Sequence, residues 1–507
     1  MKIFKIFLNR IFVFGFLILI QILWVFFIGR ELLEHYSWIH YLMRLISLMV
    51  VLWLVNKDEN PSYKISWIIV VLLFPMFGGL LYLLIGNKKP SHKIRRILQP
   101  ALDEISQVAL LEDDVSKTLT ESKQDALHYL SDLGYGTYLR TKCRYYSLGD
   151  YCYGDLLKDI SQAKKYIFME YFIVSEGLMF ENILKILAQK VQEGVEVRFI
   201  YDDVGSITTL PYHFEKKLEQ LGIQCVVFNP FIPLVSARMN HRDHRKICII
   251  DGNIGYSGGF NLADEYINVK VRFGHWKDTG IRLEGDAVQS LTVTFLEMWN
   301  AVSDKDANDS DFSKYLFHYD YAAQQTGFVQ PYADSPMDNE QVGEEVYISM
   351  INKAEKYCWF MTPYLIITDE MTHALCLAAK RGVDVRIITP GIPDKKFIYN
   401  ITRSFYHGLV KHGVRVYEWT PGFCHAKMSV ADDCMATCGT INLDYRSLYH
   451  HFENGCFMAD CQAVVEIKND LIRTMGECRD VTDQYQTGRS AYLRLGQLFM
   501  RLFAGLL

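Results

Sequence analysis

The sequence lacks an excess of basic residues. Its 507 residues carry 53 Lys and Arg against 58 Asp and Glu, which gives a formal net charge of −5 at pH 7. A dedicated nucleic-acid-binding protein usually carries a basic surplus that neutralises phosphates. The charge balance therefore disfavours nucleic acid as the partner of this chain.

The sequence also lacks the cysteine pattern of a disulfide framework. Its 12 Cys include no C-x-x-C pair and form no dense short cluster. Cys248, Cys424 and Cys456 stand among apolar residues, where a buried, reduced thiol is the ordinary role. This cysteine usage fits a reducing compartment better than an oxidising one.

No small-residue cleavage site follows the first hydrophobic run, residues 11–29. That run has 19 residues without a charged side chain, and a second run, residues 65–86, has 22. About 20 apolar residues cross a ~30 Å hydrocarbon core, whereas the apolar part of a cleaved signal peptide is shorter. We therefore predict membrane-spanning helices near 11–29 and 65–86.

A third hydrophobic stretch, residues 39–55, contains His40 and Arg44. It is interpreted as a span, as one arm of a re-entrant hairpin or as an interfacial helix. Basic residues flank the whole region: Lys2, Lys5 and Arg10 before it, and Lys88, Lys89, Lys93, Arg95 and Arg96 after it. Because basic flanks favour the cytoplasmic side, an even number of crossings is expected. We predict a multi-pass anchor in the plasma membrane and a cytoplasmic catalytic domain, with the crossing number left open.

The chain repeats itself after this region. The segment KYIFMEYFI at 165–173 is similar to KYCWFMTPYLI at 356–366, and GVEVR at 194–198 is similar to GVDVR at 382–386. In each copy a helical pattern leads into an apolar strand. Strands that alternate with helices predict βαβ units, so we expect an α/β fold with a mostly parallel sheet in each half.

The repeat also predicts the domain boundaries. In chain order these are a membrane anchor at 1–97, a helical linker at 98–135, a first half at 136–302, a polar connection at 303–326, a second half at 327–490 and a C-terminal tail at 491–507. The tail carries two Arg among apolar residues at helical spacing. It is expected to be amphipathic, and it either lies at a membrane interface or packs in the core.

One motif ends each half. The first copy is HRKICIID, from His244 to Asp251, followed by GGFN ending at Asn261. The second copy is HAKMSVAD, from His425 to Asp432, followed by GTIN ending at Asn442. Both read H-x-K-x-x-x-x-D, and the separation from His to Asn is 17 residues in each. Two copies at equal spacing in a duplicated fold are a strong signal of one shared site.

The residue types in the motif suit the chemistry of a phosphodiester. His and Lys two apart on a strand point to the same face, so the duplication is expected to place two imidazoles and two ammonium groups around one pocket. One imidazole attacks phosphorus while the other protonates the leaving alkoxide. Charge on the non-bridging oxygens would be neutralised by the Lys ammonium groups and the Asn amides. The residues expected in these roles are His244, His425, Lys246, Lys427, Asn261 and Asn442.

This arrangement needs no metal and no other cofactor, because its cations are built in. His241 and His244 are close enough in sequence to suggest zinc. No Cys or carboxylate stands at ligand spacing around them. The sequence therefore predicts no metal site.

Acidic residues have other expected roles. Asp251 precedes Gly252 at a turn and lies an odd number of residues from Lys246, so it is expected to hold the strand end rather than face the phosphate. Asp278 and Glu453 are candidates for the carboxylates that orient the imidazoles, with a salt bridge or helix cap as the structural alternative. Glu170 is a candidate buried acid lining the pocket, with a solvated strand end as its alternative.

The paired motif resembles the phospholipase D superfamily over about residues 136–490, and the finer resemblance is to bacterial cardiolipin synthases. The segments that carry it are RMNHRDHRK at 238–246, GGFNLADEY at 258–266, WKDTG at 276–280, TPY at 362–364 and NLDYRS at 442–447. It implies two duplicated phospholipase D-like βαβ sandwich halves with a pseudo-twofold active site, preceded by transmembrane helices. It further implies His244 as nucleophile and His425 as acid. The chain departs from the pattern in its first hydrophobic run and in Thr440, where Ser is common.

The resemblance implies transfer of a phosphatidyl group from one phosphatidylglycerol to another, which yields cardiolipin and releases glycerol. A phospholipase D or a phosphatidylserine synthase would pass the same group to water or to serine, and a nuclease would act on nucleic acid. The hydrophobic anchors and the acidic charge favour lipid. The expected partners are thus phosphatidylglycerol, other anionic phospholipids and the bilayer, and the sequence leaves the acceptor and the oligomeric state open.

Overall fold

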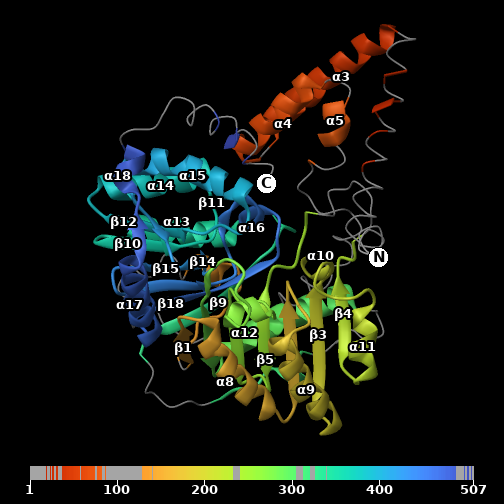
Figure 1. The fold of residues 1–507 in the computed structure, drawn as a ribbon, viewed down its shortest axis with the longest axis vertical. Helices are drawn as coiled ribbons and strands as arrows, with labels where there is room; N and C mark the ends of the chain where they lie inside the picture. The colour runs from red at the N-terminus through yellow and green to blue at the C-terminus, as the bar shows by residue number, and fades with distance from the viewer. Residues whose placement is uncertain are drawn as a thin grey trace.

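The computed structural model describes residues 37–57, 59–74, 77–82, 128–139, 141–231, 240–303, 312–319, 326–338 and 340–486, with a few single positions elsewhere. Two sheets form its centre. Figure 1 shows the first half, in yellow and green, below the second half, in cyan and blue. A helical hairpin, in red, projects from the second half.

The first sheet has seven strands in the order β1-β8-β6-β5-β2-β3-β4. Their bounds are Lys142–Tyr146 for β1, Gly280–Glu284 for β8, Ile254–Gly258 for β6, Lys246–Ile250 for β5, Tyr166–Tyr171 for β2, Glu196–Asp202 for β3 and Gln224–Phe228 for β4. Its helices are α8 (Gly149–Ser161), α9 (Leu178–Gln192), α10 (Asp203–Ser206), α11 (Phe214–Gln220) and α12 (Val288–Val302).

The second sheet has eight strands in the order β19-β13-β12-β10-β15-β16-β18-β9. Their bounds are Cys478–Asp480 for β19, Arg415–Trp419 for β13, Asp384–Pro390 for β12, Tyr357–Met361 for β10, Met428–Ala431 for β15, Met435–Gly439 for β16, Glu453–Ala459 for β18 and Phe328–Asp334 for β9. Its helices are α13 (Val342–Lys353), α14 (Asp369–Lys380), α15 (Lys396–Val410), α16 (Tyr445–Tyr449), α17 (Gln462–Gly476) and α18 (Thr482–Gln486).

The two sheets confirm the duplicated α/β fold. Read from one edge, β4-β3-β2-β5-β6-β8-β1 corresponds strand for strand to β13-β12-β10-β15-β16-β18-β9, and β19 is an addition at the edge. One buried apolar core contains Ile247 and Ile281 of the first half together with Val430 and Cys456 of the second. Side chains also bond across the halves, as Asn454 Nδ2 does to Ser257 Oγ at 2.7 Å. The halves are therefore packed as one body.

The expectation of mostly parallel sheets is wrong. In the described first sheet only the β2–β3 and β3–β4 pairings are parallel, and in the second only β10–β12 and β12–β13 are. The reason is a tight turn after each motif strand. Asp251 and Gly252 have φ of 55° and 64°, and Asp432 and Asp433 have φ of 51° and 63°, so the chain reverses into an antiparallel neighbour without a crossover helix.

The hairpin consists of α3 (Ser37–Asn56), α4 (Pro61–Leu73) and the short α5 (Phe77–Leu81). The Asn60 side chain accepts from Ser62 N and caps α4, with Pro61 in the first turn. A small core of Leu54, Tyr63, Trp67, Val71 and Tyr82 holds the helices together. The corner of the hairpin, where α3 leads into α4, is hydrogen-bonded to the second half. Ser62 Oγ donates to Asp369 Oδ2 at 3.3 Å, and Tyr445 OH donates to Asn60 Oδ1 at 3.1 Å.

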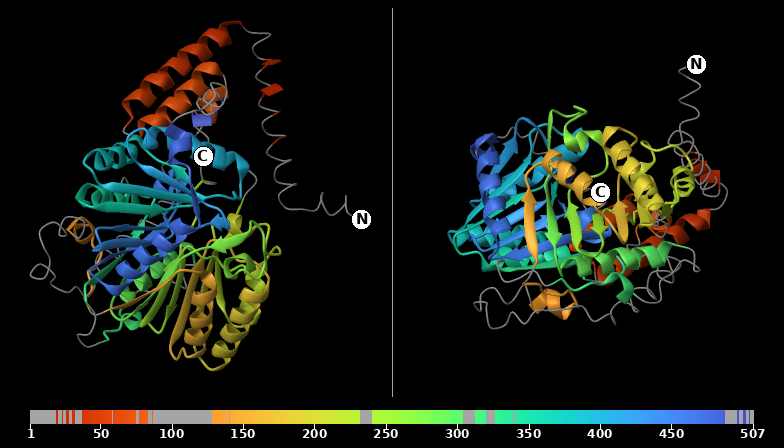
Figure 2. Two further views of the ribbon diagram at one scale, coloured as in Figure 1. Left: turned by 60° about the vertical axis from the view of Figure 1, so that its left-hand side comes forward. Right: turned by 90° about the horizontal axis from the view of Figure 1, so that it is seen from below.

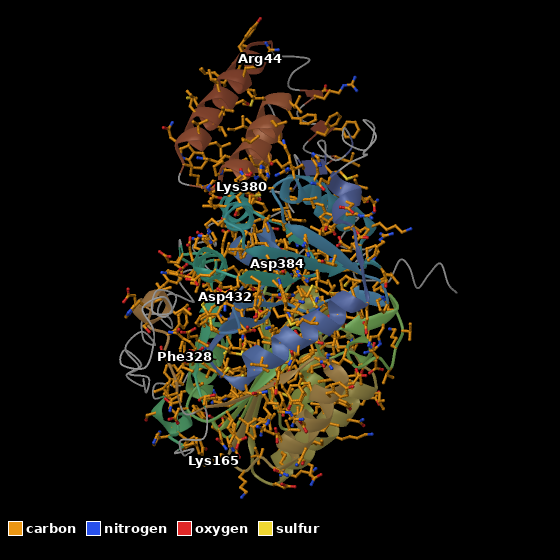
Figure 3. All side chains as sticks on the ribbon, turned by 90° about the vertical axis from the view of Figure 1, so that its left-hand side faces the viewer. Arg44, Lys165, Phe328, Lys380, Asp384 and Asp432 are labelled. Atoms are coloured by element: carbon orange, nitrogen blue, oxygen red, sulfur yellow. The ribbon has the colours of Figure 1, made fainter. Side chains whose placement is uncertain are left out.

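Only part of the region predicted to contact the membrane lies within the described residues. Among those residues no helix is both long enough and apolar enough to cross a bilayer. The stretch 39–55 falls within α3, and Arg44 lies near the outer end of that helix, far from the sheets (Figures 2 and 3). Most of the run 11–29, the end of 65–86, the basic flanks, most of 98–135 and 303–326, and most of the tail lie outside the described residues.

Candidate active site

Each motif His lies two or three residues before the motif strand of its own half and is held by the other half. His244 comes two residues before β5, and its backbone N donates to Phe452 O at 2.9 Å. His425 follows β14 (Gly422–Cys424), which pairs in parallel with β7 (His275–Lys277), and its N donates to Lys277 O at 2.7 Å. Backbone pairing across the halves therefore fixes both imidazoles in one place.

The two imidazoles line one cavity of about 510 Å³. Asn261 and Asn442 line it as well, as the motif predicts. Its apolar wall includes the aromatic side chains of Phe172, Tyr266, Trp276 and Phe423. Its charged lining comprises the cationic side chains of Arg272, Lys395 and Arg446 and the carboxyl groups of Glu265, Asp394 and Asp444. A cavity with these walls suits an anionic group that carries apolar substituents.

The candidate orienting carboxylates contact the imidazoles crosswise. His244 Nδ1 lies 2.9 Å from both Glu453 oxygens, and His425 Nδ1 lies 2.7 Å from Asp278 Oδ2. Each acid thus comes from the half opposite to its His. Burial lowers the pKa of both imidazoles well below its usual value, and the nearby ammonium groups lower it further. A neutral imidazole that donates from Nδ1 keeps a lone pair on Nε2 for attack on phosphorus.

The two acids are held differently. Glu453 also accepts from Thr440 Oγ1 at 2.5 Å and from Ser447 Oγ at 2.7 Å. Asp278 accepts from Thr279 N at 2.9 Å, and burial raises its pKa to about 7. At the position corresponding to Thr440 the first half has Gly259, where a Cβ would lie 1.9 Å from Asp278 Oδ1. The second residue of the G-[GT]-x-N segment therefore contacts the orienting acid of its own half: Thr440 donates to Glu453, and Gly259 leaves space for Asp278.

Thr440, where the chain departs from the usual Ser, provides a test of this contact. Thr440→Ser keeps the hydroxyl and should keep activity within about twofold. The near-isosteric Thr440→Val leaves one Glu453 oxygen without this donor, and we expect a loss of roughly tenfold in kcat, on the scale of 1–2 kcal/mol for one buried hydrogen bond. Equal activity of the folded Ser and Val variants would show that the hydroxyl does not matter.

The two lysines lie behind the imidazoles rather than in the cavity wall. Lys246 Nζ donates to His244 O, Lys427 Nζ donates to His425 O, and Lys427 Nζ also lies 2.8 Å from His425 Nδ1. Neither residue lines the 510 Å³ cavity. This differs from the expected ring of two imidazoles and two ammonium groups. In this arrangement the lysines act on the cavity through their charge.

Burial lowers the pKa of Lys246 to about 7 and that of Lys427 to about 8. A lysine with a depressed pKa keeps its charge below that pKa and loses it as the pH rises. We therefore expect kcat/KM, which reports the free enzyme, to fall as the pH rises from 7 to 9. A pH profile measured on purified protein checks this, and a flat profile to pH 9 would contradict it.

The motif aspartates lie at the far ends of their strands. Asp251 accepts from the backbone N of Lys164, Lys165 and Tyr166 at 2.7–3.0 Å. Asp432 does the same with Glu355, Lys356 and Tyr357 at 2.6–2.9 Å. Each Asp lies five positions after its Lys, at about 3.3 Å per residue of extended chain. The aspartates tie the hairpin turn to the neighbouring strand and do not reach the cavity.

The two asparagines are not equivalent. Asn261 Oδ1 accepts from Ile173 N at 2.9 Å, and its Nδ2 donates to Tyr266 OH at 2.6 Å. Asn442 Oδ1 is buried and has no hydrogen-bond partner among the described residues. The Asn261 amide is thus already fixed by protein contacts, whereas Asn442 retains unused hydrogen-bonding capacity in the cavity wall.

Glu170 does not line the cavity, and it is not a solvated strand end either. It is fully buried in β2, with Arg245 Nη1 3.6 Å from its Oε1, and burial raises its pKa well above the usual value. Tyr171 pairs with Lys246 and Glu170 with Ile247. Because side chains alternate along a strand, Glu170 points to the sheet face opposite to Lys246.

His451 is a site residue that the motif does not predict. Its ring centroid lies 5.5 Å from that of His244, and its Nδ1 lies 3.6 Å from Glu453 Oε1. The one feature of the sequence that could have indicated His451 as a site residue is its position two residues before Glu453. Among the described residues, His244, His451 and Glu453 form the one group whose ligand atoms come within 4.8 Å of one another. The ammonium groups of Lys246 and Lys427 oppose a cation there.

Two copies of one α/β half, each supplying an H-x-K motif to a shared cavity, define the phospholipase D class of fold and site. A family model described as "Cardiolipin synthase, PLD-like domain" matches residues 156–299 and 347–475. A second, described as "Phospholipase_D-nuclease N-terminal", matches residues 45–87.

Relatives match along most of the chain. Cardiolipin synthase 2 of Bacillus cereus is 34% identical over 459 residues, which are 89% of this chain and 88% of that protein. An uncharacterized protein of Streptococcus mutans is 43% identical over 461 residues, 90% of this chain and 99% of that protein. The crystal structure of a phosphatidylserine synthase of Haemophilus influenzae superposes with a TM-score of 0.58 at 14% identity, over 76% of this chain and 98% of that chain, a likeness of fold.

The chain therefore belongs to the cardiolipin synthase family of the phospholipase D superfamily. It is an enzyme of the phosphatidyltransferase class.

Proposed function

We propose that this protein transfers a phosphatidyl group from one phosphatidylglycerol to the terminal hydroxyl of another and releases glycerol. The crosswise pairing of two neutral imidazoles with buried carboxylates at one cavity carries the proposal. The cationic side chains of Arg272, Lys395 and Arg446 suit lipid phosphates, and the aromatic wall suits the apolar parts of the substrate. The relatives named cardiolipin synthase add support for the acceptor.

In the first half-reaction, His244 Nε2 attacks phosphorus, and the bond from phosphorus to the glycerol oxygen breaks. His425 gives a proton to the leaving alkoxide, so glycerol departs neutral. An anionic phosphodiester in the cavity favours the imidazolium form of His425 before this step. Asp278, with its pKa raised to about 7, is suited to share that proton.

In the second half-reaction, the hydroxyl of another phosphatidylglycerol attacks the phosphohistidine. His425 takes its proton, and His244 is released with cardiolipin as the product. The assignment of nucleophile and acid follows the resemblance, and the pKa of Asp278 supports it. Lys246 and Lys427 stabilise the additional negative charge through the field of their ammonium groups.

The proposed function is tested by incubating the purified protein with phosphatidylglycerol alone. We expect cardiolipin and free glycerol to appear in equal amounts. Phosphatidate with glycerol and no cardiolipin would identify water as the acceptor and overturn the proposal. Adding serine should yield no phosphatidylserine.

We also propose that the hairpin of α3 and α4 contacts the bilayer and that the catalytic halves face the cytoplasm. Its outer face exposes large apolar side chains: Trp38, Tyr41, Leu45, Leu48, Leu52, Trp53, Ile65 and Leu73. The basic flanks and the 12 free thiols support the cytoplasmic side.

The sidedness is tested with an impermeant thiol reagent on intact cells that express a variant with a single cysteine placed near residue 310. Labelling should require lysis. Rapid labelling without lysis would place the catalytic halves outside the cell.

A further inference from the structure

A second cavity, of about 570 Å³, lies between the corner of the helical hairpin and the second half. We call it the acidic cavity. Seven of its lining residues carry a carboxylate: Glu59, Asp334, Asp338, Glu340, Glu344, Glu345 and Glu370. Among the described residues, Lys57 is the only Lys or Arg in the lining, and it is already paired with Glu59 at 2.5 Å. Carboxyl groups therefore dominate the charged lining, while burial raises the pKa of Asp334, Glu344 and Glu345.

His451 connects the acidic cavity with the active site, because it lines both cavities. Its side chain is 10% exposed, its Nδ1 lies 3.6 Å from Glu453 Oε1, and its Nε2 has no hydrogen-bond partner among the described residues. Glu59, another lining residue, is 9% exposed; its Oε1 pairs with Lys57, and its Oε2 has no partner among the described residues. Buried polar atoms in native proteins are usually bonded, so unpaired atoms at the boundary of a polar cavity indicate a ligand with hydroxyl or amino groups.

The distribution of the carboxylates argues against a single bound metal ion. Among the described residues, the only three ligand atoms within 4.8 Å of one another belong to His244, His451 and Glu453. The seven carboxylates of the acidic cavity form no such group, so they are too dispersed to surround one cation. Some still crowd one another, because burial and the charges of Glu340 and Glu370 raise the pKa of Glu345.

The two cavities differ in the charge that they accept. The active-site cavity has Arg272, Lys395 and Arg446 for phosphate groups, whereas the acidic cavity repels anionic headgroups. Ionised carboxylates are pure acceptors and bind hydroxyl groups that donate. A small neutral polyol therefore fits the acidic cavity, whereas an anionic lipid substrate does not.

We infer that the acidic cavity binds glycerol and is its path to and from the active site, with His451 as the side chain that separates the two cavities. This inference rests on the proposed function, in which glycerol leaves neutral after taking a proton from His425. The lipid products stay in the active-site cavity, with its aromatic wall, and the polyol leaves on the other side of His451.

The test uses the reverse of the first half-reaction. Full-length protein in phosphatidylglycerol vesicles is given labelled glycerol, and label entering phosphatidylglycerol is measured against glycerol concentration, beside cardiolipin formation. Glu345→Lys places a cation at an exposed position of the wall, and Ile348→Trp narrows the cavity. Glu181→Lys, on the outer face of α9, is the control with the same change in charge.

We expect Glu345→Lys and Ile348→Trp to raise the half-saturating glycerol concentration at least fivefold, with Glu181→Lys unchanged in both glycerol dependence and cardiolipin formation. If Ile348→Trp fails to fold, Glu345→Lys carries the test. A half-saturating concentration within twofold of wild type in the folded variants overturns the inference. If the wild type binds magnesium or calcium, Glu345→Lys abolishes that binding and the glycerol dependence is unchanged, the ligand of the acidic cavity is a cation and not a polyol.

The same assay separates the inference from the proposed function. Wild-type protein that exchanges glycerol with the expected variant effects but forms no cardiolipin would keep the acidic cavity as the polyol site and overturn phosphatidylglycerol as acceptor. If cardiolipin forms but glycerol exchange is unaffected by the variants, the proposed function stands and the acidic cavity is not the polyol site. A wild type that does neither overturns both.

Discussion

His244→Ala and His425→Ala should each lower phosphatidyl transfer by about 10³-fold or more, because nucleophilic and acid–base groups act as a unit. Both side chains border the cavity rather than the apolar core, so the variants should still fold. Initial rates of cardiolipin formation and thermal unfolding measure the two effects separately. His213→Ala, at an exposed histidine that contacts Glu215, is the control.

Substantial turnover by either folded His variant would contradict the assignment of both imidazoles. The double variant tests whether they act together. If both imidazoles serve one reaction, the double variant should be no slower than the more damaging of the two single variants. Multiplied losses would indicate two independent contributions.

Asp278→Asn and Glu453→Gln should each lower kcat by roughly 10²- to 10⁴-fold with little change in KM, as removal of the orienting carboxylate does in catalytic triads. Each change preserves side-chain shape and removes the charge that holds its His. Since the pairing is crosswise, Asp278→Asn should add little to His425→Ala, and Glu453→Gln little to His244→Ala.

A salt bridge or cap role for these acids predicts a different result. In that case the amide variants would lower the unfolding temperature and leave kcat close to wild type. Measuring both quantities on the same preparations distinguishes the two roles. Multiplied losses of Asp278→Asn and His425→Ala in the double variant would contradict the geometry.

The sequence predicts that the motif histidines and asparagines line one cavity, because their pattern is local. A His two residues before a Lys on an apolar strand identifies both, and equal spacing in two copies predicts that they meet. The turn role of Asp251 also follows from its neighbour Gly252 and from strand parity. The structure adds the three backbone N–H groups that each motif Asp accepts from.

Features that depend on how the halves pack are not visible in the sequence. The crosswise pairing of His244 with Glu453 requires the interface between the halves. The face of Glu170 depends on strand register, since one residue of shift exchanges the two faces of the sheet. The fold of Lys246 back to the His244 carbonyl depends on its rotamer. His451 has no counterpart in the motif, so only the structure places it between two cavities.

The most direct measurement of the central claim is to trap and map the covalent intermediate. The protein is quenched during turnover of phosphatidylglycerol labelled at phosphorus, and the labelled residue is identified by mass spectrometry. We predict a phosphatidyl adduct on His244, retained in His425→Ala if that variant can still load, and absent from His244→Ala. A label on His425 would reverse the roles of the two imidazoles, and turnover without any histidine adduct would contradict the two-step mechanism.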